Sequence, residues 1–129
     1  MSATPREVLE RLLAGIAGGG DRSRLFELYA EDAVVDLPFA RPTPVRLSGR
    51  DGLRQHFEAG PGDAIQVKAS NVRVYEATDP EVVIAEFDYD VTGPAGTAHV
   101  TNVQVMRVRD GLIVESRDYH DHARLASVF

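Results

Sequence analysis

Apolar side chains recur at helical spacing through the first sixty residues, which predicts helices before most of the strands. The stretch TPRE opens the first helix as a capping box, in which Thr4 caps the helix, Pro5 suits its first position and Glu7 reaches back to the cap. Glycines at 18–20 end this helix. Its apolar stripe consists of Val8, Leu9, Leu12, Leu13 and Ile16.

A second helix, a short strand and a third helix are expected next. Asp21 can cap the second helix, whose buried stripe includes Leu25, Phe26, Leu28 and Tyr29. Residues 33–39, AVVDLPF, form a short strand that stops at a proline-rich stretch. The third helix, within residues 50–60, has a buried stripe that includes Leu53, His56 and Phe57, so we expect this histidine to be packed and not catalytic.

From residue 65 onward apolar and polar residues alternate, which is typical of strands. We expect strands over residues 65–77, 82–91, 97–108 and 112–120. The apolar phase shifts within the first of these, which predicts a bulge near Ser70–Asn71. Helices followed by a run of hairpins indicate an α+β fold, with helices on one face of a curved antiparallel sheet and a single domain over residues 1–129.

The composition argues against several classes of protein. The chain has 14 basic and 20 acidic residues and a net charge of −6, whereas phosphate recognition needs clustered Lys and Arg. It has no cysteine, which excludes thiolate catalysis, disulfides and cysteine metal sites. Its N-terminus is polar, and its apolar runs are too short to span a bilayer. We therefore expect a cytoplasmic protein that binds neither nucleic acid nor membrane.

The link between the last two strands decides where the polar stretch IVESRDYHDH, residues 113–122, points. A two-residue turn at Asp110–Gly111 would place Asp118 on the face of Val103 and Val105. A three-residue loop over 109–111, with a left-handed glycine, shifts the pairing by one and moves every side chain across the sheet. We favour the three-residue loop because it gathers four polar side chains on one face, namely Asn102, Gln104, Ser116 and Asp118.

This register has consequences for both faces of the sheet. The polar face points toward the helices, where each unsatisfied polar group costs about 1–3 kcal/mol, so these side chains are tolerated best around a cavity that holds water or ligand. Burial raises the pKa of a carboxyl, so Asp118 is a candidate general acid or base. Val103 and Val105 then lie on the outer face without a cover in this chain, which predicts a homodimer through that face.

The stretches LYAEDAVVDLPF, GRDGLRQHF and VQVMRVRDGLIVESRDYHD resemble the SnoaL-like branch of the nuclear-transport-factor-2-like superfamily over about residues 8–122. Ketosteroid isomerase and limonene epoxide hydrolase belong to the same superfamily. The resemblance implies a cone-shaped α+β barrel, in which three N-terminal helices pack on a strongly curved mixed, mostly antiparallel sheet around a central pocket, usually in a dimer. Members include isomerases, polyketide cyclases, epoxide hydrolases and non-catalytic binding modules.

The resemblance argues against ketosteroid isomerase chemistry. The general-base aspartate of that enzyme falls on Leu37 of this chain. Its oxyanion tyrosine falls on Leu13 and its oxyanion aspartic acid on Gln104. This protein is therefore not expected to be a true ketosteroid isomerase.

The epoxide hydrolase is matched only in part. Its arginine and aspartate on a middle strand fall on Phe87 and Tyr89, whereas its last-strand aspartate is matched by Asp118. One member of the hydrolase triad is thus present. The resemblance also turns five other side chains inward, namely Tyr89, Asn102, Gln104, Ser116 and His120.

We expect an isomerase, cyclase or hydrolase that uses acid–base catalysis, without cofactor or metal, on a small hydrophobic molecule of polyketide, terpene or steroid type. The candidate catalytic residues are Asp118, Tyr89, His120 and Asp36, the last turned inward by a bulge before Pro38. The candidate substrate-binding residues are Asn102, Gln104, Ser116, Leu13, Ile16, Leu37, Phe39, Phe57, Phe87 and Met106.

Three other interpretations remain open. A binding module could hold a hydrophobic ligand without chemistry, and a structural dimer could have a cone filled by side chains. A metal could bind Asp118, His120 and His122, although ligands along one straight strand would span roughly 13 Å.

Overall fold

The computed structural model describes residues 2–17, 22–59 and 64–129, and these form a curved sheet with helices. In chain order the elements are helix α1 (Pro5–Ala17), 3-10 helix η1 (Arg22–Leu28), strands β1 (Tyr29–Leu37) and β2 (Val45–Ser48), helix α2 (Gly49–Glu58), strands β3 (Gln66–Glu76), β4 (Val82–Gly93), β5 (Gly96–Arg109) and β6 (Leu112–Tyr119), and helix α3 (His122–Ala126).

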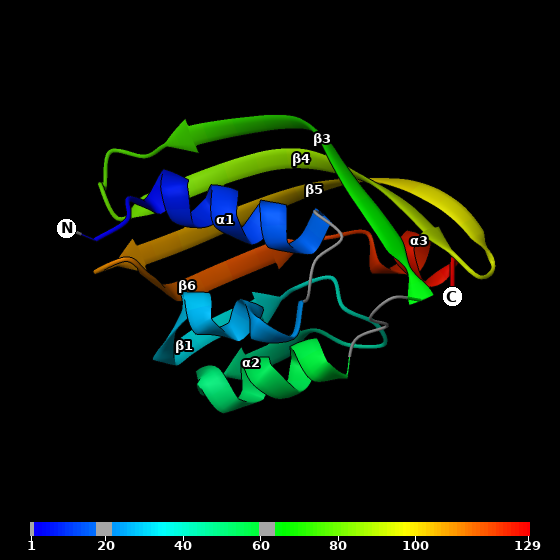
Figure 1. The fold of residues 1–129 in the computed structure, drawn as a ribbon, viewed down its shortest axis with the longest axis horizontal. Helices are drawn as coiled ribbons and strands as arrows, with labels where there is room; N and C mark the ends of the chain where they lie inside the picture. Colours follow the sequence, from blue (N-terminus) through cyan, green and yellow to red (C-terminus); the bar gives the residue numbers. More distant parts are fainter. Residues whose placement is uncertain (1, 18–21, 60–63) are drawn as a thin grey trace.

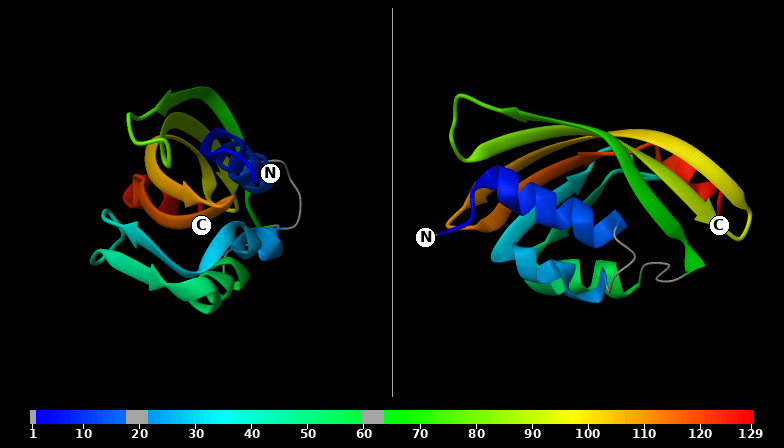
Figure 2. Two further views of the ribbon diagram at one scale, coloured as in Figure 1. Left: turned by 90° about the vertical axis from the view of Figure 1, so that its left-hand side faces the viewer. Right: turned by 45° about the horizontal axis from the view of Figure 1, so that its top comes forward.

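One sheet of six strands organises the fold, in the order β2-β1-β6-β5-β4-β3. Neighbouring strands are antiparallel except β1 and β6, which are parallel. The sheet is strongly curved and does not close on itself, and α1, η1 and α2 lie on its inner side (Figures 1 and 2). The predicted α+β class and the mixed, mostly antiparallel sheet are confirmed.

Helix α1 begins as the sequence predicts. The Thr4 backbone N–H donates to Glu7 Oε1 at 3.0 Å, and the Glu7 N–H donates to Thr4 Oγ1 at 3.2 Å, which is a reciprocal capping box. The stripe that starts at Val8 is buried and packs on β3, β4 and β5. The expected glycine stop at 18–20 and the expected cap at Asp21 lie outside the described residues.

The prediction of an α-helix through Tyr29 is wrong. Residues Arg22–Leu28 form a 3-10 helix, and Tyr29 is already the first residue of β1, where it is paired with Ile113 of β6. Strand pairing thus overrides the helical spacing of the preceding apolar residues. Strand β2 and helix α3 were not predicted, because they are only four and five residues long and mostly exposed.

The β5–β6 hairpin reaches the predicted register by a different route. Asp110 and Gly111 form a two-residue turn with φ of 52° and 77°, as a turn with two left-handed residues requires. The expected three-residue loop is therefore wrong. A bulge at Val114 of β6 supplies the extra residue instead, because Arg109 faces Leu112 near the turn whereas Gln104 faces Asp118 beyond the bulge. The predicted set of inward polar side chains is thereby obtained.

The bulge predicted in β3 is confirmed. The β3–β4 register shifts between Ser70 and Arg73, and Asn71 has a φ of 52°. Its side-chain Nδ2 donates to Asp88 Oδ2 at 2.8 Å, which fixes the bulge to the neighbouring strand.

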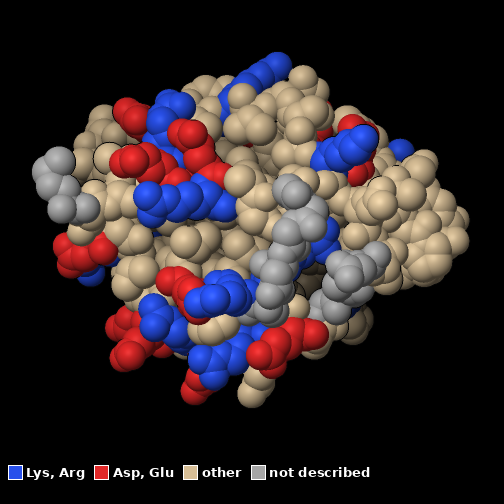
Figure 3. All heavy atoms as spheres, viewed as in Figure 1, with Lys and Arg blue, Asp and Glu red and all other residues tan. Residues whose placement is uncertain are grey.

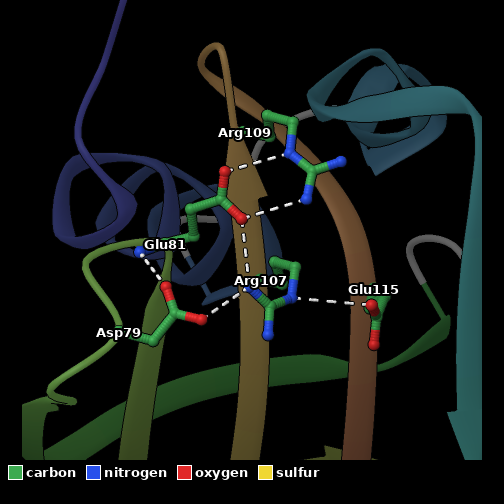
Figure 4. A network of polar contacts seen from close by, with 5 residues as sticks. All are labelled: Asp79, Glu81, Arg107, Arg109 and Glu115. Atoms are coloured by element: carbon green, nitrogen blue, oxygen red, sulfur yellow. Dashed lines mark hydrogen bonds and ion pairs between the residues drawn. The ribbon is translucent and has the colours of Figure 1, made fainter.

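Val103 and Val105 lie on the outer face of the sheet, as expected, and are half-buried. A network of charges lies on the same strands at one end of this face (Figure 4). The Arg107 guanidinium is 2.9 Å from Asp79, 3.0 Å from Glu81 and 3.5 Å from Glu115, and Arg109 also binds Glu81. The network joins the β3–β4 turn to β5 and β6. A dimer through this face stays a prediction.

Acidic and basic side chains lie beside each other over the helices rather than in separate patches (Figure 3). Several of them form exposed pairs, such as Arg6 with Glu76 and Arg24 with Glu27. Pairs of this kind contribute little stability individually. Within the described ranges, no helix combines the length and apolar character needed to cross a membrane.

The last residues of the chain are hydrogen-bonded to the turn of the β4–β5 hairpin. Val128 is buried, and its carbonyl oxygen accepts a hydrogen bond of 3.0 Å from the Ala95 N–H. Gly93 allows this approach, because a Cβ there would lie 2.2 Å from the Val128 oxygen. Helix α3 is capped by Asp121, whose side chain accepts from the Arg124 N–H at 3.0 Å.

His99 bridges two carboxylates on the outer face. Its Nδ1 lies 2.7 Å from Asp90 Oδ1, and its Nε2 lies 3.3 Å from Asp88 Oδ2. These carboxylates, Asp90 first, raise the pKa of His99 above its usual value. The His99 side chain is exposed.

We predict that His99→Gln lowers the melting temperature at pH 5.5 and has little effect at pH 9. Because the folded-state pKa is raised, the ion-pair contribution is complete below the unfolded pKa of about 6.5 and disappears as pH rises through the folded pKa. Thermal unfolding at both pH values measures the difference. His56→Gln is the matched control and should not reproduce it, since burial lowers the pKa of His56. An equal loss at both pH values would contradict the ion-pair explanation.

Candidate functional site

A cavity of about 130 Å³, here called the inner cavity, lies between the helices and the inner face of the sheet. Most of its wall is apolar, and its polar groups come from β1, α2, β4, β5 and the end of β6. The lining residues are Leu12, Ile16, Tyr29, Val35, Leu37, Leu47, Leu53, His56, Phe57, Tyr89, Gln104, Asp118 and His120.

Asp118 is the carboxyl group of this cavity. It faces Gln104 across the β5–β6 pair, and Ser116 Oγ donates to Asp118 Oδ1 at 2.5 Å. Gln104 Nε2 in turn donates to Ser116 Oγ at 3.2 Å, so the amide and the hydroxyl orient the carboxyl. Burial raises the pKa of Asp118 to about 6, although the hydrogen bonds from Ser116 and Gln104 oppose this shift. The carboxyl can therefore gain or lose a proton near neutral pH.

His120 lines the same cavity and has one unprotonated ring nitrogen. Asn102 Nδ2 donates to the Phe87 carbonyl oxygen at 3.3 Å, which leaves Asn102 Oδ1 as an acceptor 2.8 Å from His120 Nδ1. The hydrogen of the neutral imidazole is thus on Nδ1, and Nε2 keeps its lone pair. Burial, helped by the charge of nearby His122, lowers the pKa of His120 to about 4, so the ring is neutral at physiological pH.

Two tyrosines complete the polar part of the inner cavity. Tyr89 stacks on His120, with ring centroids 6.4 Å apart, and Tyr29 lies against Phe57, with centroids 6.1 Å apart. Burial, followed by the charge of Asp118, raises the pKa of both phenols above the usual value. Both are therefore hydrogen-bond donors at any physiological pH.

The structure brings together most of the predicted catalytic side chains. Asp118, Tyr89 and His120 all line the inner cavity, and so do four of the predicted substrate-binding residues, Gln104, Ile16, Leu37 and Phe57. Five others are buried but do not line it, namely Asn102, Ser116, Leu13, Phe87 and Met106. Asn102 and Ser116 act there as orienting groups for His120 and Asp118.

The expected inward position of Asp36 is wrong. Its carboxylate binds the Arg46 guanidinium at 2.7 and 3.1 Å and lines a larger, open groove of about 630 Å³ between β1, β2 and β6 on the outer face. The strand keeps its alternation before Pro38, so no bulge turns the side chain inward. Phe39 does not line the inner cavity either: it is 60% exposed and contacts Tyr119 edge-on.

Tyr29 and His56 are the polar lining residues that the sequence reading missed. Tyr29 was assigned to a helical stripe, where a tyrosine has no reason to point at Asp118. His56 was expected to be packed on a buried stripe, but it is exposed and lies on the wall of the inner cavity. Recognition of LYAED as a strand start was the signal that could have found Tyr29.

The polar residues at the end of β6 do not gather as metal ligands. Among the described residues, no group of three or more His, Asp or Glu side chains is placed to hold a metal ion. His122 Nε2 is buried and has no hydrogen-bond partner among the described residues. The His122 and His120 rings are edge-on, with their centroids 5.8 Å apart.

Comparisons with known proteins give a consistent result. Residues 9–116 match the SnoaL-like domain. An uncharacterised PhzA/B-like protein of Pseudomonas aeruginosa is 31% identical over 108 residues, which cover 81% of this chain and 76% of the relative. A Bacillus subtilis crystal structure described as an inferred isomerase has a TM-score of 0.82 at 26% identity, over 97% of this chain and 94% of that one. An LEH-like epoxide hydrolase of M. tuberculosis, at 17% identity, shares the fold with a TM-score of 0.73 over 96% and 88% of the two chains.

We predict that Asp118→Asn stabilises the protein at pH 7.5 by roughly 2–3 kcal/mol, because a pKa about two units above the unfolded value corresponds to about 1.4 kcal/mol per unit. A raised carboxyl pKa means that stability is complete below the unfolded pKa and falls as pH rises through about 6. The gain should therefore shrink toward pH 4.

Urea unfolding of both proteins between pH 4 and pH 8 measures this difference. The asparagine retains an acceptor for Ser116, and Asp32→Asn, at an exposed position of β1, is a control that should change little. A variant that is less stable than the natural protein at pH 7.5 would show that the ionised carboxyl is well solvated.

Proposed function

This chain belongs to the SnoaL-like domain family, and we propose that it is an enzyme that acts by acid–base catalysis on a small hydrophobic organic molecule in the inner cavity. The observation that carries the proposal is the buried carboxyl of Asp118, whose pKa of about 6 suits proton transfer near neutral pH. The reaction would be an isomerisation, a cyclisation or a hydrolysis.

The pKa values of the two titratable groups, Asp118 and His120, are in the reverse of their usual order. In water a carboxyl loses its proton well before an imidazolium does, whereas here the pKa of Asp118 is about 6 and that of His120 about 4. Between these values a protonated carboxyl and a neutral imidazole coexist in one apolar site. Above pH 6 both groups are proton acceptors. Asp118 can therefore serve as general acid at mildly acidic pH and as general base at neutral pH.

The surrounding side chains support these roles without taking part in proton transfer. Gln104 and Ser116 hold the Asp118 carboxyl, and Asn102 fixes the His120 tautomer. Tyr89, which lines the cavity, would donate to a substrate oxygen and stabilise charge that develops there. The apolar wall would exclude water, which strengthens these interactions.

A non-catalytic binding module is the alternative function. The observation that favours it is the apolar side chain of Leu37 in the cavity wall, at the position where the resemblance places the general base of ketosteroid isomerase. In this alternative the same cavity holds a hydrophobic ligand, and Asp118 only contributes to its recognition.

We predict that Asp118→Asn lowers kcat/KM by at least roughly a hundredfold on any substrate that the natural protein converts, because a general acid–base group contributes about that much. A panel of epoxides, enones and small aromatic ketones, followed by thermal shift and by product analysis, identifies the substrate. The pH–rate profile of the natural protein should show an ionisation near pH 6 that is absent in the variant.

Asp32→Asn is again the matched control and should retain full activity. Turnover that is unaffected by Asp118→Asn, or a profile that is flat between pH 5 and pH 8, would contradict the proposed role. Ligand-induced thermal shifts without turnover of any panel member would support the binding module.

A further inference from the structure

Two hydroxyl groups of the inner cavity have no hydrogen-bond partner among the described residues. Tyr29 is 2% exposed and Tyr89 is 7% exposed, and both line the cavity. Among the described residues, no hydrogen bond joins either phenol oxygen to another group. By contrast, the neighbouring Ser116, Gln104, Asn102 and His120 side chains are all engaged with one another or with the backbone.

Neither hydroxyl oxygen is among the fully buried polar atoms that lack a partner, so both are open to the space of the inner cavity. A molecule in the inner cavity is therefore the natural acceptor for both phenols. The two rings reach the cavity from different strands, β1 and β4. The charge of Asp118 helps to raise the pKa of both phenols, so both lie at the end of the cavity where Asp118 is. An oxygen that accepts from two donors needs two lone pairs, as a carbonyl oxygen has.

The size of the inner cavity limits the rest of the molecule. Its volume of about 130 Å³ is close to the roughly 150 Å³ of an engineered apolar cavity that binds benzene, and far below the roughly 300–1,000 Å³ of pockets for drug-sized ligands. Most of the remaining wall is apolar, with Leu12, Val35 and Leu53 among its residues. One ring fills this space, whereas a fused ring system does not.

We propose that Tyr29 and Tyr89 together donate hydrogen bonds to the carbonyl oxygen of a one-ring ketone or enone, whose ring lies against the apolar wall. Tyr29 is thereby a substrate-binding residue of the site. The inference rests on the proposed function in that it concerns the same cavity, and it narrows the substrate from the polyketide, terpene or steroid range to a single ring.

The probe for this inference is cyclohex-2-enone, with methylenecyclohexane as a ligand of similar shape that lacks the oxygen. We expect the enone to bind with a carbonyl stretching frequency below its value in hexane, and Tyr29→Phe and Tyr89→Phe each to shift the frequency back and weaken binding roughly three- to tenfold. Binding of methylenecyclohexane should be unchanged in both variants. Tyr75→Phe, at a tyrosine that is 47% exposed on β3, is the matched control.

Larger ketones test the size limit in the same assay. The two-ring ketone 1-tetralone and the four-ring ketone androst-4-ene-3,17-dione should bind at least tenfold more weakly than cyclohex-2-enone. Equal or tighter binding of either would overturn the one-ring assignment. A failure of the one-ring ketone to bind, or a carbonyl frequency that Tyr29→Phe leaves unchanged, would overturn the donor pair.

These outcomes are distinguishable from those that concern the proposed function. Infrared and binding measurements need no turnover, so they remain informative if the protein is a binding module. Conversely, loss of turnover in Asp118→Asn together with an unshifted carbonyl frequency in Tyr29→Phe would retain the acid–base role and reject the donor pair. Circular dichroism of both tyrosine variants verifies that the fold is intact.

Discussion

The extra residue at Val114 of β6 is the constraint on which the inner cavity depends. Without this bulge the two-residue turn at Asp110–Gly111 would set Asp118 opposite Val103, on the outer face. With it, Asp118 and Gln104 face each other beneath the helices. Because side chains alternate along a strand, one inserted residue transfers the whole polar set to the inside. The carboxyl, its orienting amide and the histidine beyond it are thus consequences of a single local irregularity.

Desolvation accounts for both pKa shifts at the site. It raises the pKa of the Asp118 carboxyl and lowers that of the His120 imidazole, because it disfavours the charged form of each. Hydrogen bonds then determine the orientation of the groups, through Ser116 for the carboxyl and Asn102 for the ring. A carboxyl with a raised pKa lowers the stability of the folded state above that pKa, as is common where a protein keeps a titratable group available for chemistry.

The sequence predicts the fold and much of the candidate site because long periodic segments dominate both. The capping box at Thr4, the bulge near Asn71 and the inward set around Gln104 follow from patterns of spacing. The misses share a different cause. Tyr29 and Asp36 were misplaced because strand pairing with β6 and β2 sets their environment, and such pairing joins residues that lie far apart in the chain. The bulge at Val114 has no local signature, and only its effect on the polar residues could be anticipated.

The attachment of Val128 to the β4–β5 hairpin gives the chain end a second role. His120 lies between two fixed points, the pairing of β6 at one side and this remote anchor at the other. The segment that carries His120 is therefore attached to the β4–β5 turn, whose residues 93–96 do not line the cavity. A side chain at position 93 would clash with the Val128 carbonyl oxygen, so a change there would release this end of the segment that carries His120 without altering any residue of the cavity wall.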